Sequence, residues 1–247
     1  MRVRGPDSTS RCVLSSPTNL KSEIRTAMKI KVRKTAFAAA EPEISEVEAA
    51  FDSEKIEWNP IECINWKEYP CKPEVSFRIM HSESEIYIQY KVRQQGARAV
   101  YDFDCDSKPW TDDCVEFFTT PSPTCGKYFN LEMNCIGHGI FCYGPDRLHR
   151  FSCDGPVVSR IRRHASLGGT PIDLKGDVEW SLTVAIPKEL YSVAGDEIPP
   201  FSGRTVPANF YKCGDDTDTP HFLSWNPIST PAPDFHCPEY FGELAFE

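Results

Sequence analysis

The stretch KYFNLEMNC, residues 127–135, alternates apolar and polar residues over the length of a strand. Successive side chains of a β-strand point to opposite faces of a sheet. One face would carry Phe129, Leu131, Met133 and Cys135, and the other Tyr128, Asn130, Glu132 and Asn134. This pattern predicts a half-buried strand of an antiparallel sheet.

The same alternation recurs along the chain. It is clear at 75–79, 86–92 and 178–186, and weaker strand patterns lie near 98–103, 113–119, 139–143, 157–163, 206–212, 221–225 and 241–246. Helical periodicity is scarce, with one short helix expected at 42–51. About ten strands with little helix predict an all-β fold: a two-sheet antiparallel β-sandwich or jelly roll with one or two short helices.

Composition indicates a soluble globular chain. It has 247 residues, 40% hydrophobic and 26% charged, with a net charge of −9. An acidic balance argues against nucleic acid as a partner, because phosphate binding needs a basic face. No apolar run is long enough to span a membrane. We expect residues 1–27 to be a disordered N-terminal extension and 28–247 to be one domain.

The eleven cysteines and the N-terminus bear on location. Cys114 and Cys135 fall inside predicted strands, where a free cysteine behaves as a small hydrophobic residue. We therefore interpret most cysteines as buried thiols in a reducing compartment. Since residues 1–27 contain no apolar stretch typical of a signal peptide, we expect a cytoplasmic location, or a secreted form if the start is misdefined.

A second stretch, KPWTDDCVEFF (residues 108–118), places a carboxylate inside the most apolar run of the chain. By alternation, Val115 and Phe117 share one face, whereas Glu116 lies on the other. A partly buried carboxylate costs free energy unless it is paired or hydrogen-bonded, so Glu116 should meet an arginine or a ligand hydroxyl. Trp110, in the preceding loop, is either a core residue or a platform for stacking.

Two further groups of residues could bind a small molecule. Asn130, Glu132 and Asn134 would form a row of hydrogen-bonding groups on one sheet face, suited either to solvent or to sugar hydroxyls. The aromatic C-terminal part contains residues that combine a flat or apolar body with a polar tip, a mixture typical of pockets. These are Asn209, Tyr211, Trp225 and His236.

Several motifs together resemble one known family. In order they are INWKEYPCKPEVSFRIMH, WTDDCVEFF, YFNLEMNCIG, VEWSLTVAIP, ANFYKCGD, PHFLSWNPI and PDFHCPEYFGELAF, which together span most of residues 28–247. Their order and spacing are similar to those of the family 9-like carbohydrate-binding domain, a member of the DOMON-like group of β-sandwiches. The resemblance implies a sandwich that binds carbohydrate at one face.

The resemblance also implies roles for individual residues. Family 9 modules clamp a terminal sugar between two tryptophans, and a glutamate six residues after the first bonds its hydroxyls. Trp110 and Glu116 have that spacing. The arginine that those modules carry on the next strand has no match in 128–134. For the second tryptophan, Trp225 and Tyr211 are both candidates.

Metal and haem sites are the competing interpretations. The resemblance to family 9 modules, which carry structural calcium, also implies a candidate calcium site. Calcium would suit two acidic loops, one with Asp102, Asp104 and Asp106 and the other with Asp215, Asp216 and Asp218. Zinc could be drawn from Cys135, His138, Cys142 and His149, although the spacing is loose. Haem, bound by some DOMON-like domains, would need axial ligands from Met80, His81 and Met133.

We interpret the chain as a non-catalytic binder of a mono- or oligosaccharide, such as one derived from xylan or glucan, in carbohydrate catabolism. The expected binding residues are Trp110, Glu116, Asn130, Glu132, Asn134, Asn209, Tyr211 and Trp225. The alternative is a glycoside hydrolase of the endoxylanase kind, in which Glu116 and Glu132 on neighbouring strands would act as the paired carboxylates. No sequence feature specifies a partner enzyme.

Overall fold

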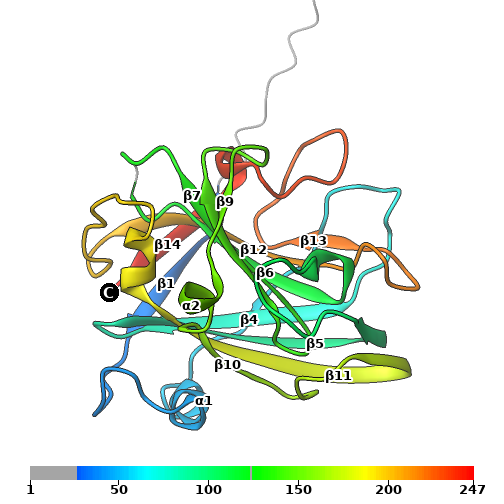
Figure 1. Ribbon diagram of the computed structural model, residues 1–247, viewed down its shortest axis with the longest axis horizontal. Coiled ribbons are helices and arrows are strands. Elements are labelled where there is room, and N and C mark those ends of the chain that lie inside the picture. Colours follow the sequence, from blue (N-terminus) through cyan, green and yellow to red (C-terminus); the bar gives the residue numbers. More distant parts are fainter. Residues whose placement is uncertain (1–26, 123) are drawn as a thin grey trace, which may run out of the picture.

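A computed structural model describes residues 27–122 and 124–247. These residues form two packed β-sheets (Figure 1). The back sheet has the order β10-β11-β5-β4-β1 with β2 beside β4, and the front sheet has the order β1-β14-β12-β6-β7-β8-β9 with β13 beside β12 and β3 beside β13. The predicted β-sandwich is confirmed, and the expected extension lies, apart from residue 27, outside the described residues.

The back-sheet strands are β2 (Asn59–Pro60), β4 (Glu74–His81), β5 (Glu85–Ala99), β10 (Arg162–Ala165) and β11 (Ile172–Pro187). The front-sheet strands are β3 (Cys63–Ile64), β6 (Cys114–Thr119), β7 (Tyr128–Asn134), β8 (Gly139–Gly144), β9 (Phe151–Ser152), β12 (Thr205–Cys213), β13 (Phe222–Ser224) and β14 (Gly242–Phe246). The helices are α1 (Ile44–Ser53) and α2 (Gly155–Val158), with 3₁₀ turns at Pro109–Thr111, Lys188–Ser192 and Pro238–Tyr240.

Strand β1 (Lys29–Lys34) joins the two sheets. Its first four residues pair with β14 and its last two with β4, in both cases in parallel. The other pairings in the described chain are antiparallel, as the alternation predicts. Since β1 belongs to both sheets, it closes one edge of the sandwich and leaves fewer unpaired backbone groups there.

The core lies between the sheets and follows the predicted alternation. Val115 and Phe117 of β6 pack into it, as do Phe129, Leu131 and Met133 of β7. The alternate residues of β4, β5 and β11 meet them from the back sheet. Helix α1 covers the opposite face of the back sheet, where Val47 and Phe51 pack against Met80, Tyr87 and Ala185 (Figure 1).

Two predicted strands differ from the structure. Of the strand expected over 157–163, only Arg162 and Arg163 are extended, as the start of β10; the chain before them forms α2, in which the Asp154 carboxylate accepts a hydrogen bond from the Val157 amide. Over 98–103, β5 ends at Ala99. The Asp112 carboxylate accepts hydrogen bonds from the amides of Val100 and Tyr101, so these amides bond to a side chain instead of a neighbouring strand.

Candidate functional site

A pocket of about 420 Å³ opens on the face of the front sheet that points away from the core. This volume lies in the range of small-molecule sites, roughly 300–1,000 Å³. Strands β6, β7 and β12 supply the floor, and loops of the front sheet supply the walls. The lining residues are Tyr69, Trp110, Glu116, Glu132, Arg147, Leu148, Arg150, Cys213, Asp215, Phe222, Pro233, Asp234, Phe235 and His236.

Strand register brings two carboxyl groups together on the floor. Glu116 of β6 is the cross-strand partner of Glu132 of β7 and of Tyr211 of β12. Glu116 and Glu132 are only 3% and 2% exposed. Like charges directly opposed on neighbouring strands repel each other, and burial disfavours a charge, so this arrangement disfavours ionisation of both groups at once.

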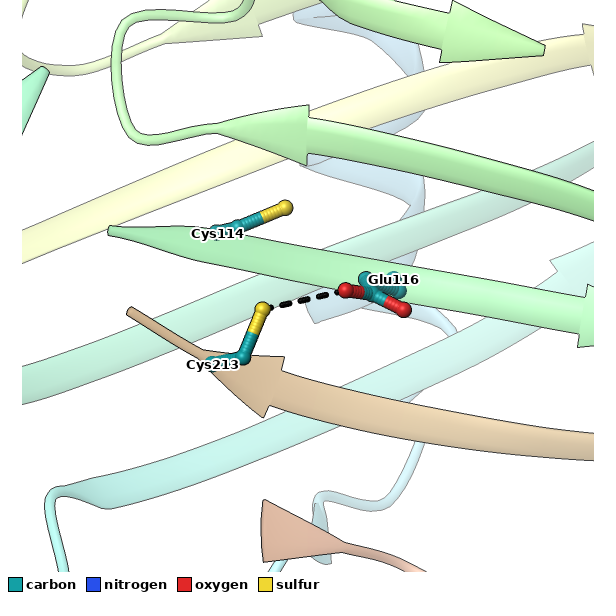
Figure 2. Close-up of side chains that lie close together, drawn as sticks. All are labelled: Cys114, Glu116 and Cys213. Carbon is teal, nitrogen blue, oxygen red and sulfur yellow. Dashed lines mark hydrogen bonds between the residues drawn. The ribbon is translucent and has the colours of Figure 1, made fainter. Parts of the chain in front are cut away.

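Glu116 is the more strongly perturbed of the two. Burial, followed by the charge of Glu132, raises the pKa of Glu116 well above its usual value. The Cys213 thiol donates a hydrogen bond to Glu116 Oε1 at 3.0 Å (Figure 2). A neutral carboxyl group can both donate and accept, which suits recognition of a hydroxyl.

Glu132 has polar partners of its own. Asn130 Nδ2 donates to Glu132 Oε1 at 2.8 Å, and Arg150 Nη1 lies 3.4 Å from the same oxygen. Burial raises the pKa of Glu132, and the Arg150 guanidinium opposes that rise. Glu132 and Arg150 therefore place a carboxyl group and a cation side by side at the pocket.

The two aspartates after Trp110 anchor the loop that carries it. Asp112 accepts hydrogen bonds from Asn134 Nδ2 at 3.0 Å and from Arg98 Nη1 at 3.2 Å. The carboxylate of Asp113 forms an ion pair with Lys212 Nζ at 2.9 Å. Burial alone would raise the pKa of Asp113, but Lys212 and the hydrogen bonds to this carboxylate outweigh it and lower that pKa. Trp110 itself is partly exposed at the pocket.

Aromatic rings form the other wall. Phe222 packs edge-on against Tyr69, with ring centroids 4.7 Å apart, and Phe235 lies next to Phe222. His236 contacts the Tyr128 hydroxyl at 2.8 Å through Nδ1. Burial, followed by the charges of Arg150 and Arg147, lowers the pKa of His236 to about 2, so its ring is neutral at ordinary pH.

The model of a carbohydrate-binding family, family 9, matches residues 45–246. The chain belongs to carbohydrate-binding family 9. No curated protein matches it. The structure is similar to that of a candidate carbohydrate-binding protein from Bacteroides uniformis, with 39% identity, a TM-score of 0.85, and 90% of this chain and 100% of that chain covered.

Two more distant structures share the fold. Both are a family 9 carbohydrate-binding module from Caldicellulosiruptor kristjanssonii, one in complex with glucose and one with cellotriose. Each is 12% identical to this chain, with TM-scores of 0.55 and 0.52. Each match covers 89% of this chain. It covers 96% of the chain in the glucose complex and 94% of the chain in the cellotriose complex. At this identity, the similarity establishes the fold alone.

Of the eight residues expected at the family 9 site, Trp110, Glu116 and Glu132 line the pocket together. Asn130 and Tyr211 support it from beneath. Asn130 donates to Glu132, while the ring of Tyr211 stacks on Phe235 at a centroid distance of 4.2 Å. These two residues hold lining side chains in place and do not line the pocket themselves.

The structure places Trp225 away from the pocket, in the core between the sheets. It is 1% exposed and packs edge-on against Phe77 and Phe210, each with ring centroids 5.9 Å away. A Cβ atom at Gly242 would lie 2.5 Å from the indole, so the glycine is needed for this packing. Trp225 therefore cannot serve as the second stacking platform.

Asn134 and Asn209 also have structural partners instead of an open face. Asn134 Nδ2 donates to Tyr101 O and to Asp112. Asn209 Nδ2 donates to Asn226 O, and its Oδ1 accepts from the Asn226 amide. Both residues are completely buried. Loops cover the ends of this sheet face, on which alternation correctly places Asn134.

Several pocket residues were not predicted from the sequence. Arg150, from the loop between β8 and β9, supplies the cation that strand 128–134 lacks. Tyr69 comes from the loop after β3, and Asp234 and Phe235 come from the loop after β13. Only the aromatic density of the C-terminal part indicated that these loops could contribute.

The proposed calcium and zinc ligands do not fit those ions. Asp104 instead contacts Arg163 and His138, and Asp218 contacts Lys175. His149 contacts Asp146. Met133, considered as a haem ligand, is a core residue. Among the described residues, the one group with converging potential metal ligands is Cys114, Glu116 and Cys213 (Figure 2).

The burial that the sequence predicts for most cysteines is confirmed for six free thiols: Cys114, Cys135, Cys142, Cys153, Cys213 and Cys237. Separately, no helix of the described chain is long and apolar enough to cross a membrane.

Proposed function

We propose that the pocket binds the terminal unit of a mono- or oligosaccharide, without hydrolysing it. The observation that carries this proposal is the position of the partly exposed Trp110 ring beside the buried carboxyl group of Glu116 in one pocket. An aromatic face packs on the C–H side of a sugar ring, while a buried polar group fixes its hydroxyls.

Each pocket group has a role in this proposal. Trp110 supplies the stacking face. Glu116 and Glu132 bond hydroxyl groups, and Arg150 donates to a sugar oxygen while keeping Glu132 oriented. Because most of these groups are buried before a ligand arrives, little side-chain entropy is lost on binding.

Hydrolysis is the alternative that the paired carboxyl groups raise. A hydrolase needs one carboxylic acid and one ionised carboxylate beside the scissile bond. Here Glu116 Oε1 accepts a hydrogen bond from the Cys213 thiol, and Glu132 Oε1 is held by Asn130 and Arg150, so both carboxyl groups are already engaged by protein partners. Family 9 is a family of binding modules, and we assign the pair to hydroxyl recognition.

Calorimetric titration with glucose, xylose, cellotriose and xylotriose tests the proposal. We expect at least one of these sugars to bind with micromolar to millimolar affinity, roughly −4 to −8 kcal/mol. Trp110→Ala should weaken that binding, whereas Trp58→Ala should not, since Trp58 is 40% exposed and lies outside the pocket. Equal binding by wild type and Trp110→Ala would refute the site, and release of reducing sugar would refute the non-catalytic assignment.

A further inference from the structure

Two thiols that saccharide binding does not use lie at the floor of the pocket: Cys213 lines it, and Cys114 is buried beside Cys213. Cys213 and Cys114 are cross-strand partners on β12 and β6, and Glu116 lies two positions further along β6 on the same face. Figure 2 shows the three side chains on one side of the sheet, with Cys213 pointing to Glu116. One donor atom from each residue lies within 4.8 Å of the other two.

We propose that Cys114, Glu116 and Cys213 bind a thiophilic divalent cation of the zinc type. In a tetrahedral zinc site, neighbouring sulfur and oxygen ligands are separated by about 3.6–3.8 Å, as follows from Zn–S and Zn–O bonds of about 2.3 and 2.1 Å. The 3.0 Å hydrogen bond from Cys213 Sγ to Glu116 Oε1 is therefore shorter than that spacing by about 0.6–0.8 Å. Small rotations of the side chains would open the group enough to admit the ion.

Burial makes a cation the natural partner of this group. Cys114 is completely buried, and Cys213 and Glu116 are 2% and 3% exposed. A divalent cation would displace two thiol protons and any carboxyl proton into solvent, and its charge would compensate the resulting anions.

The donor set selects the type of ion. Thiolates bind zinc and softer cations, whereas calcium and magnesium require oxygen ligands. Cys213 and Glu116 line the pocket, so three protein ligands would leave the fourth position open to water or another small ligand on that side. This arrangement differs from a closed structural site with four protein ligands.

Cobalt serves as a spectroscopic probe for this site. The reduced full-length protein, stripped of metal with a chelator, is titrated with Co²⁺ in a phosphine reductant and then challenged with Zn²⁺. We expect one equivalent of Co²⁺ to give a near-ultraviolet thiolate-to-cobalt absorption band, which Zn²⁺ abolishes. No saccharide is added, so this result stands apart from the proposed function.

Variants identify the ligands. Cys114→Ser and Cys213→Ser should each weaken Co²⁺ binding at least ~10-fold, and the double variant should abolish the band. The matched control is Cys153→Ser, because Cys153 is a buried free thiol of the main core, outside this group. It should retain the band. A band that survives in the double variant would overturn the proposal.

X-ray absorption at the zinc edge, on wild-type protein, gives a test that no folding defect can obscure. We expect two sulfur neighbours at about 2.3 Å, with the remaining ligands being oxygen or nitrogen. No sulfur neighbours, or four of them, would overturn the site. So would failure of the reduced protein to retain zinc on gel filtration.

Discussion

Trp110 and Trp225 are predicted to have opposite roles, and a pair of alanine substitutions separates them. Trp225 is 1% exposed and packs against Phe77 and Phe210, and its ring occupies the space that a side chain at position 242 would fill. Its indole Nε1 has no hydrogen-bond partner, so replacement costs packing and apolar burial alone. Trp225→Ala should therefore lower the free energy of unfolding by about 3–5 kcal/mol.

Trp110→Ala should have the reverse profile. Trp110 is partly exposed, and its loop is held by the carboxylates of Asp112 and Asp113 rather than by the indole. We expect a stability change within ~1 kcal/mol. Saccharide affinity should fall ~30-fold, since an aromatic anchor of about 2 kcal/mol is lost.

Urea unfolding and calorimetric titration of both variants measure these effects. Binding is compared where each variant is fully folded, so that loss of stability is not mistaken for loss of affinity. Trp225→Ala should then bind saccharide within ~3-fold of wild type. The assignment fails if folded Trp225→Ala loses as much affinity as Trp110→Ala, or if Trp110→Ala is the more destabilised of the two.

Three other predictions concern charged groups. Asp113→Asn should lower the free energy of unfolding at pH 7 by about 3–5 kcal/mol, because it leaves Lys212 charged and buried. Recovery of stability in the double variant Asp113→Asn with Lys212→Met would confirm this cause. An unchanged urea midpoint for Asp113→Asn would contradict the prediction. The raised pKa of Glu116 means that its stabilising contribution is complete below about pH 4.3 and is lost as pH rises through that raised pKa. The unfolding free energy of wild type minus that of Glu116→Gln should therefore decrease from about pH 4.5 upward in urea titrations, and a difference that does not vary with pH would refute the shift. Arg150→Ala should raise the pKa of Glu132 further and weaken saccharide binding ~10-fold in calorimetry, whereas unchanged affinity would remove Arg150 from the site.

The fold and the floor of the site could be predicted from sequence because both depend on a period of two. Alternation along 113–119 correctly separates Val115 and Phe117 from Glu116, and the same argument places Glu132 on the pocket face. The Trp110 to Glu116 spacing needs only a short loop and one strand, so local sequence determines it.

The alternation of apolar and polar residues does not show which loops cover a sheet face. Asn134 lies on the face that alternation predicts, and Asn209 is a predicted site residue, yet covering loops give both a structural role. Arg150, Tyr69 and Asp234 reach the pocket on three separate loops, and their arrangement depends on packing between segments far apart in sequence. Trp225 directly follows the short strand β13, where three residues are too few to reveal a buried side.

Fluorine NMR of protein labelled with 5-fluorotryptophan tests the central claim most directly. The five tryptophans are Trp58, Trp66, Trp110, Trp180 and Trp225. The Trp110 resonance is assigned as the one that is absent from the spectrum of Trp110→Phe. On titration with the saccharide that binds, the Trp110 resonance should show the largest shift and saturate, while those of the buried Trp180 and Trp225 should stay in place. A saturating shift at Trp225 or Trp180 with Trp110 unmoved would contradict the proposed pocket.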